Sequence, residues 1–405
     1  MNNQADRKVM VAGNLVLDIT PRFPAADKFD FGRMFSPGKL IHVGEAVLST
    51  GGAVSNTGLA MAKLGVEVIL NSKVGDDNFG EILTGLIGNR AAARIKKVSE
   101  RPTPYTLVIA PPDVDRIFLH APGTSDTFGA DDVDYEAAGS CDLFHFGYPP
   151  VMKRMYENDG EELAEIFRRI KDMGLTTSLD MALPDPSSSA GEANWRKILA
   201  NALPCVDIFL PSIEEITFML DRDLFEKRCT EAKGRDPVLF YEPRDCQAIA
   251  DKLLSMGVKT VLLKMGIRGC YLRTAQEAKM SDVGRASLPK VAPWSNRELW
   301  AASLRADSFV SAVGAGDATI AGFLCGFIRG FSPEDCLNIA SIVGWQNVQR
   351  LDTLSGIEDW PKTLKLLGDK TMPRNPAGLQ DSTWDFCAQR QAYSGPNDQK
   401  ASRLK

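Results

Sequence analysis

The chain has 405 residues, of which 44% are hydrophobic, and its formal net charge is −5. A chain of this length can bury a large core, and its mildly acidic, mixed charge excludes an extended basic surface for nucleic acid. No apolar run approaches the roughly 20 residues that cross a bilayer, so we expect no membrane partner. The first residues lack the apolar core of a signal peptide, and the eight cysteines contain no Cys-x-x-Cys pair, so we expect a cytoplasmic protein with reduced thiols. The three histidines lack metal-ligand spacing, which argues against a zinc site.

Short apolar runs alternate with amphipathic segments along most of the chain. This alternation is typical of an α/β fold in which helices cover a mostly parallel sheet. The predicted strands are 9–12, 67–70, 106–110, 143–146, 176–179, 208–210 and 260–264. The predicted helices include 56–64, 161–173, 246–256 and 318–327.

Three segments depart from this rhythm. Residues 18–50 mix Pro, Phe and Gly with an alternating apolar stretch, which predicts a small antiparallel lid, with a long surface loop as the alternative. Residues 275–305 are polar with scattered Trp, and the stretch from 373 onward is rich in Gln, Asn and Ser, so both are predicted to be appendages. We therefore predict one domain over 1–372, to which 18–50 contribute a lid, and a polar tail over 373–405.

An aspartate follows the first predicted strand. Asp18 stands where ligands of open α/β sheets gather, at the carboxyl end of a strand, and a carboxylate there can bind two sugar hydroxyls. A solvated loop aspartate is the alternative.

A glycine pair then leads into the first predicted helix. Gly51 and Gly52 allow a ligand to contact the backbone, and Asn56 offers both a donor and an acceptor to a polyhydroxy ligand. The alternative for Asn56 is a helix cap.

A carboxylate directly follows a turn of small residues at 311–316. Gly314, Ala315 and Gly316 let backbone N–H groups approach an anion at the start of a helix, where phosphate binds favourably. Asp317, at the same place, can accept a proton from an attacking hydroxyl. The alternative for Asp317 is a simple N-cap.

These elements occur in a characteristic order. Asp18, the Gly51-Gly52…Asn56 turn, and the segments 75–80, 211–215 and 314–317 follow one another as in ribokinase-like PfkB sugar kinases, and the resemblance spans residues 8–360. It implies a three-layer α/β sandwich with a small β-sheet lid that covers the sugar and often forms a dimer contact. It also implies ATP and Mg²⁺, so 1–372 is the expected kinase domain.

The resemblance also assigns roles. Asp317 matches the catalytic base, and the amides of Gly314, Ala315 and Gly316 match an anion hole for the moving phosphoryl group. Lys264, Gly266 and Gly269 match a loop on which ATP lies against backbone, with an ordinary strand-ending turn as the alternative. Glu215 matches the residue that organises Mg²⁺, through water.

Two positions depart from the family pattern. Ser212 stands where many members carry Asn, which puts the contacts to metal-bound water in question. Ser311, Ala312 and Val313 stand where members often carry Asp-Thr-Thr, which helps to hold a monovalent cation. Because such ions need a shell of oxygen ligands, we expect weak or absent K⁺ dependence.

The acceptor is the least defined element. The segments around His120 and His145–Tyr148 end predicted strands and are candidates to line a sugar pocket, with core residues as the alternative. A nucleoside acceptor and a sugar-binding pseudo-kinase remain as alternatives to a sugar kinase. A phosphorylated acceptor ranks lower, because it would need extra Lys or Arg near the lid, where Arg33 and Lys39 are the candidates.

Apolar residues in the predicted lid favour a homodimer that pairs lid to lid. They are Phe29, Phe31, Met34 and Phe35.

Overall fold

The computed structural model describes residues 7–24, 36–111, 117–286, 288, 290–379 and 383–398. Its centre is an eleven-stranded sheet with the order β14-β15-β13-β12-β11-β10-β9-β8-β1-β4-β5. From β5 to β11 neighbouring strands pair in parallel, and from β11 to β14 they pair antiparallel. The strands are β1 (Lys8–Gly13), β4 (Glu67–Gly75), β5 (Ala92–Val98), β8 (Leu143–Gly147), β9 (Thr176–Leu179), β10 (Ile208–Phe209), β11 (Thr260–Lys264), β12 (Cys270–Thr274), β13 (Glu298–Ala301), β14 (Asp385–Cys387) and β15 (Ala392–Ser394).

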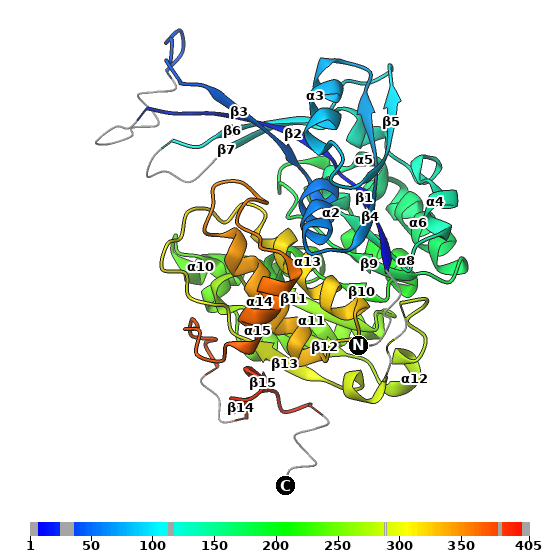
Figure 1. Cartoon of the computed structure of the whole chain (residues 1–405), viewed down its shortest axis with the longest axis vertical. Helices are drawn as coiled ribbons and strands as arrows, with labels where there is room; N and C mark the ends of the chain where they lie inside the picture. Colours follow the sequence, from blue (N-terminus) through cyan, green and yellow to red (C-terminus); the bar gives the residue numbers. More distant parts are fainter. Residues whose placement is uncertain are drawn as a thin grey trace.

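Helices cover both faces of this sheet (Figure 1). One layer comprises α2 (Ala53–Lys63), α3 (Asn78–Ile87), α12 (Glu277–Met280), α13 (Ala315–Ile328), α14 (Pro333–Asn347) and α15 (Trp360–Gly368). The other comprises α4 (Tyr135–Gly139), α5 (Lys153–Tyr156), α6 (Glu161–Asp172), α7 (Ser189–Glu192), α8 (Trp195–Ala202), α9 (Ile213–Leu220), α10 (Arg222–Ala232) and α11 (Pro243–Ser255). The predicted three-layer α/β class is confirmed.

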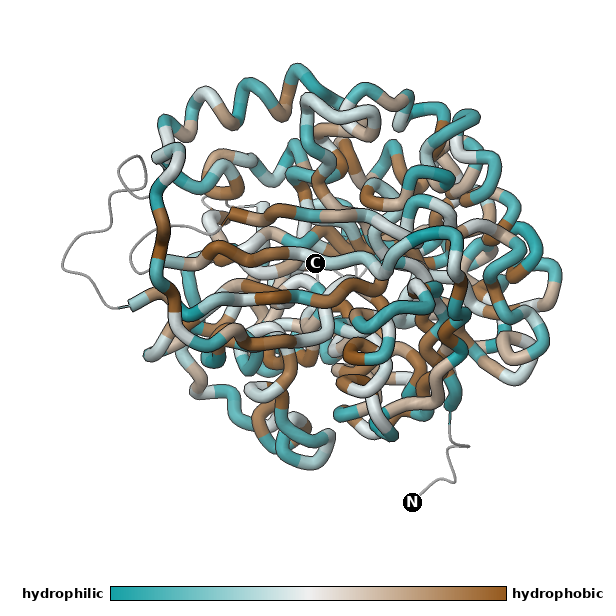
Figure 2. Tube along the Cα trace, turned by 90° about the horizontal axis from the view of Figure 1, so that it is seen from above, coloured by the Kyte–Doolittle hydropathy of each residue, from teal (hydrophilic) through white to brown (hydrophobic). Residues whose placement is uncertain are grey.

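Each face of the sheet buries its own apolar core, because successive side chains of a strand point to opposite faces. Within β1, Met10 packs in the core under α6 and α8, whereas Val9 and Val11 pack under α2 and α13. Figure 2 shows the same division along the chain: hydrophobic residues follow the interior strands, and hydrophilic residues dominate the outer turns. Within the described residues, no helix is long and apolar enough to cross a bilayer.

A separate four-stranded sheet projects from the domain, at the upper left of Figure 1. Its order is β3-β2-β6-β7, and its strands are β2 (Val16–Pro21), β3 (Ala46–Gly51), β6 (Tyr105–Ile109) and β7 (Ile117–Ala121). We call this sheet the lid. The antiparallel pair β2 and β3 flanks the segment 22–45, while residues 25–35 lie outside the described part of the chain.

The strand predicted at 106–110 was wrongly placed in the large sheet. It forms β6 of the lid and pairs in parallel with β2, with Thr106 opposite Asp18. A strand of a doubly covered parallel sheet is buried on both faces, whereas β6 exposes Tyr105 and buries Thr106. Its short apolar run alone does not distinguish the two settings.

The prediction that 275–305 and the stretch from 373 are appendages was also wrong. β13 lies inside the large sheet, and the strands β14 and β15 of the tail extend it. Trp300 is fully buried, and the polar Arg297 is 1% exposed because it forms an ion pair with Asp398 of the tail. Polar composition concealed these strands because their charges are neutralised by partners far along the chain.

Candidate active site

The helix α13 begins at the predicted phosphate-binding turn. Its N-cap is Gly314, whose φ of +72° lies in the left-handed region that favours glycine. Asp317 is therefore not the N-cap but the third residue of the helix. The amide of Ala315 donates to the carbonyl of Ala312 at 3.2 Å, and helix geometry also leaves the N–H groups of Gly314, Gly316 and Asp317 without an intrahelical acceptor.

The carboxylate of Asp317 is buried among three donors. The Asn56 amide donates to Oδ2 at 3.1 Å, the Tyr148 hydroxyl to Oδ2 at 2.8 Å, and the Thr57 hydroxyl to Oδ1 at 3.2 Å. Burial raises the pKa of Asp317, while the hydrogen bond from Tyr148 and the charge of Lys264 oppose this rise. The result is a rigidly held carboxylate of increased basicity.

Asn56 belongs to α2, which begins next to the lid. The N-cap of α2 is Gly52, with φ of +83°, and a Cβ there would lie 2.5 Å from the carbonyl oxygen of Asn14. Asn56 is thus not a helix cap, since its amide reaches Asp317 on a helix 261 positions away in sequence. A Cβ on Gly51 would lie 2.2 Å from Oδ2 of Asp18, so the glycine pair brings backbone close to that carboxylate.

Lys264 lies beneath the start of α13. Its ammonium donates to Oδ1 of Asp180 at 2.5 Å and lies 3.9 Å from Oε2 of Glu215. A Cβ built on Gly316 would be 3.8 Å from the same ammonium. A lysine charge and a helix N-terminus therefore converge on one space, and both favour an anion there.

Three buried carboxylates surround this single lysine. Burial raises the pKa of Asp180, Glu215 and Asp317, and the Lys264 ammonium opposes the rise in each. Burial lowers the pKa of Lys264, but the adjacent carboxylates outweigh it and hold the pKa above its ordinary value. Lys264 is consequently charged at neutral pH, and the cluster carries an excess of acidic groups.

Glu215 has a second task at the start of α9. Ser212 is the N-cap of this helix: its Oγ accepts from the Glu215 amide at 3.1 Å, and Oε2 of Glu215 accepts from the Ser212 amide at 2.6 Å. This reciprocal pair is a capping box, which a serine makes well. Ser212 thus fixes the orientation of the Glu215 carboxylate.

Asp18 lies on the lid strand β2, opposite Ser49 of β3 and Thr106 of β6. Burial raises the pKa of Asp18 to about 7, although a hydrogen bond from Thr106 opposes the rise. Thr106 also hydrogen-bonds Nδ1 of His120 at 3.0 Å. By strand register Asp18, Thr106 and His120 share one face of the lid, so the candidate pocket residue His120 lies on the same face as Asp18.

The predicted nucleotide loop follows β11. Gly266 and Gly269 both have positive φ, +51° and +95°, and lie at either end of a short 3₁₀ turn, Gly266–Arg268. A Cβ on Gly269 would lie 2.0 Å from the carbonyl oxygen of Ala301, so close packing on β13 also requires glycine there. The turn is tied to the antiparallel part of the sheet.

Of the remaining candidates, one is a core residue, one contacts Asp317 and the others belong to the predicted lid. His145 is fully buried, bonds Ser178 Oγ at 3.0 Å and has its pKa lowered to about 3 by burial, so it is a core residue. Tyr148, predicted in the same segment, contacts Asp317 directly. The lid candidates Arg33, Phe29, Phe31, Met34 and Phe35 lie outside the described residues, whereas Lys39 is exposed.

Sequence reasoning missed two members of the site, Thr57 and Asp180. Asp180 directly follows the predicted strand β9, and the same position after a strand identified Asp18. Nothing in the sequence distinguishes Thr57, since its contact to Asp317 depends on how α2 and α13 pack.

The stretch ahead of the turn offers few side-chain oxygens. Ser311 Oγ accepts from the amide of Val313 at 3.1 Å, and the carbonyl of Val348 accepts from the amides of Val310 and Ser311. Side-chain oxygens are absent at Ala312 and Val313.

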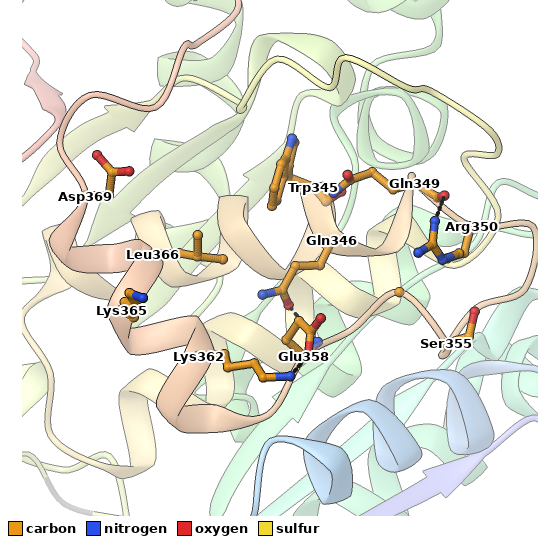
Figure 3. A pocket seen from close by; sticks show the side chains of 11 residues that line it. Trp345, Gln346, Gln349, Arg350, Ser355, Glu358, Lys362, Lys365, Leu366 and Asp369 are labelled. Atoms are coloured by element: carbon orange, nitrogen blue, oxygen red, sulfur yellow. Dashed lines mark hydrogen bonds and ion pairs between the residues drawn. The ribbon is translucent and has the colours of Figure 1, made fainter.

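A pocket of about 450 Å³ opens elsewhere, between α14 and α15 (Figure 3). Trp345 and Gln349 line one wall, and Lys362 and Lys365 line the other. No predicted site residue borders this pocket, so it is separate from the cluster around Asp317.

The chain is similar to proteins of known family. The family model described as pfkB family carbohydrate kinase matches residues 9–360. An uncharacterized sugar kinase of Archaeoglobus fulgidus is 24% identical over 300 residues, covering 74% of this chain and 98% of the relative. The 2-dehydro-3-deoxygluconokinase of Bacillus subtilis is 23% identical over 324 residues, covering 78% and 86%.

Solved structures share the fold. Arabidopsis thaliana ribokinase, complexed with ribose and ATP, has a TM-score of 0.66 and 18% identity, covering 90% of this chain and all of that one. An Escherichia coli protein described as a ribokinase II, in complex with ATP and Mg²⁺, has a TM-score of 0.65 and 19% identity, covering 89% and 99%. The expected ribokinase-like fold is confirmed, and the chain belongs to the pfkB family of carbohydrate kinases, which are ATP-dependent phosphotransferases.

Proposed function

We propose that this protein is a sugar kinase that transfers the γ-phosphoryl group of ATP to a carbohydrate hydroxyl, with Asp317 as general base. The observation that carries the proposal is the position of Asp317: a buried carboxylate at the start of α13, beside the space on which Lys264 and the helix N-terminus converge. Phosphoryl transfer requires positioning, charge neutralisation and a proton acceptor, and this arrangement offers all three.

The reaction follows from these positions. The acceptor hydroxyl replaces one donor on Asp317 and gives its proton to the carboxylate. Its oxygen bonds the γ-phosphorus as the bond from that phosphorus to the β–γ bridging oxygen breaks, and ADP leaves. Amides at Gly314, Ala315 and Gly316 form the proposed anion hole, in which Ala315 contributes least because its amide already has an acceptor.

The acceptor lies between the lid and α2 in this proposal. Asp18, ionised above its pKa of about 7, binds two hydroxyls, and Gly51 lets the backbone of β3 lie against this carboxylate. Asn56 holds Asp317 with its amide and faces the acceptor beside it. Several polar groups close together suit a polyhydroxy compound.

The donor set fits Mg²⁺ and ATP. Oδ2 of Asp180 is buried without a hydrogen-bond partner. The cluster also has three carboxyl groups, those of Asp180, Glu215 and Asp317, against the single positive charge of Lys264. Glu215 and Asp180 would hold the ion through water, as a strongly hydrated cation requires. When bound, Mg²⁺ supplies charge neutralisation on the phosphates. Lys264, Gly266 and Gly269 would hold the nucleotide.

The outer face of the lid supports a homodimer. Ile19, Leu48, Leu107 and Leu119 share the face opposite Asp18, and Leu119 is 55% exposed. A second copy that packs its own lid against this face would cover these side chains.

The deciding experiment measures ADP release from ATP across a panel of pentoses, hexoses, keto-deoxy acids and nucleosides. The matched control is Asp317→Ala. We expect turnover with a sugar that falls by about 10²- to 10⁴-fold in the variant. Preference for a nucleoside would favour the alternative acceptor, and no turnover above the control would favour a sugar-binding pseudo-kinase.

A further inference from the structure

The tail residues 373–379 and 383–398, which we call the strap, pass beside the predicted nucleotide loop. They lie beyond the segment 9–360 that matches the family model. In Figure 1 the strap runs along the antiparallel edge of the large sheet, where β15 pairs with β13. The strap is therefore in place to act on the loop.

The first part of the strap binds the segment that packs on this loop. The amide of Asn375 donates to the carbonyl of Ser303 at 2.9 Å, and its side chain donates to Ser303 Oγ at 2.9 Å and to the carbonyl of Leu304 at 3.2 Å. Ser303 Oγ in turn donates to the carbonyl of Ile267, inside the loop. A continuous chain of hydrogen bonds thus leads from the strap into the Gly266–Arg268 turn.

Arg268 makes a second connection. Its guanidinium, 4% exposed, donates to the carbonyl of Ala377 in the strap at 3.0 Å, and also to the carbonyls of Val238 and Tyr241. Trp300 lies against the same guanidinium, 5.0 Å from its ring centroid. A buried cation depends on each acceptor it has, so removing Ala377 would leave Arg268 under-satisfied and the turn less well held.

The far end of the strap is anchored independently. Asp398 forms a buried ion pair with Arg297 at 2.6 Å, and Arg297 also bonds Glu334 at the start of α14. Trp384 packs edge-on against Trp300 and Tyr271. These contacts hold the strap on the sheet and keep Ala377 and Asn375 in position.

We infer that the strap is a positioning element for the nucleotide loop, and that Asn375 and Ala377 set the affinity of the protein for ATP through Ser303 and Arg268. The inference rests on the proposed role of the Gly266–Gly269 loop in holding ATP. Among the described residues, no hydrogen bond or ion pair joins the strap to Asp18 or Asp317, so it is expected to act on the nucleotide rather than on the acceptor.

The test compares the intact chain with Asn375→Ala and with a chain that ends at Met372. The matched control is Asp385→Asn, an exposed strap position whose backbone pairs with Ser394. MgATP affinity is measured by titration calorimetry, together with kcat, KM for ATP, KM for the acceptor and Tm. Asn375→Ala removes two hydrogen bonds and keeps the Asp398 anchor, so it stays informative even if the truncated chain does not fold.

We expect Asn375→Ala to weaken ATP binding by roughly fivefold, with KM for the acceptor unchanged and Asp385→Asn like the intact chain. Unchanged ATP affinity in Asn375→Ala, or an equal rise in both KM values, would overturn the inference. If the intact chain binds no ATP, the proposed function fails, and the inference fails with it.

Discussion

The hydroxyl of Tyr148 donates to Oδ2 of Asp317 at 2.8 Å, from a residue whose backbone is left-handed, with φ of +67°. A left-handed backbone is unfavourable for a tyrosine and persists only where its surroundings impose it. Because its hydroxyl is bonded to Oδ2, Tyr148 occupies a position on the proposed base that an acceptor hydroxyl would have to replace. This relationship makes the ionisation of Asp317 dependent on Tyr148.

Replacing Tyr148 with Phe is expected to shift the pH profile of the reaction. The hydrogen bond from Tyr148 lowers the pKa of Asp317, so its loss raises that pKa further. Because the base acts when ionised, the acid limb of kcat/KM moves to higher pH, by about one unit. Steady-state rates from pH 5 to 9 measure this, with Tyr135→Phe, at a buried hydroxyl outside the site, as control. Superimposable profiles would contradict the prediction.

Acceptor binding is expected to weaken as pH falls through about 7, the pKa to which burial raises Asp18. Protonation removes the carboxylate that accepts from two hydroxyls, so KM for the acceptor rises below this pH. In Asp18→Asn the KM should be high and independent of pH, while the limb of kcat that reports Asp317 remains. A pH-dependent KM in Asp18→Asn would assign the effect to another group.

The same substitution, Asp18→Asn, is expected to increase the stability of the protein although it weakens acceptor binding. The folded pKa of Asp18 exceeds the unfolded value, so its protonated form stabilises the fold and this contribution is lost as pH rises from about 4 to 7. Above pH 7, Asp18→Asn should therefore unfold at a higher urea concentration than the wild-type chain. The increase in the free energy of unfolding should be at most about 4 kcal/mol. Urea unfolding at pH 5 and pH 8 tests the sign.

Removing the charge of Lys264 is expected to cost both stability and activity. Lys264→Met leaves Asp180 and Glu215 without their cation, which should cost about 3–5 kcal/mol in the free energy of unfolding. Lys73→Met, which breaks a buried pair with Asp132 away from the site, is the matched control for stability. Only Lys264→Met should lower kcat, by about 10²-fold. Equal activity in the two variants would show that Lys264 serves the fold alone.

The reaction is expected to proceed without K⁺. Ala312 and Val313 supply no side-chain oxygen, and the carbonyl of Val348 already accepts two amides. Initial rates in K⁺ buffer and in buffer free of monovalent metal ions should agree within about twofold. Many-fold activation by K⁺ would overturn this.

Much of the fold could be predicted from the sequence, because hydrophobic residues recur in different patterns in parallel strands and in amphipathic helices. The sequence could also predict three site residues, because each lies where a strand ends or a helix begins: Asp317, Asn56 and Lys264. The contacts among these residues could not be predicted, since Asn56 and Asp317 are 261 positions apart in the sequence. The buried polar strand at Arg297 was hidden for the same reason, because its partner Asp398 lies about a hundred residues later.

The close approach of Gly51 to Asp18 limits how this protein can change its acceptor. Even the methyl group of alanine at position 51 would overlap the carboxylate, so that position admits no gradual series of substitutions. Thr106 and His120 share the lid face of Asp18 without such a constraint. Directed evolution toward a new sugar should therefore accumulate its changes at these two positions and leave the glycine pair intact.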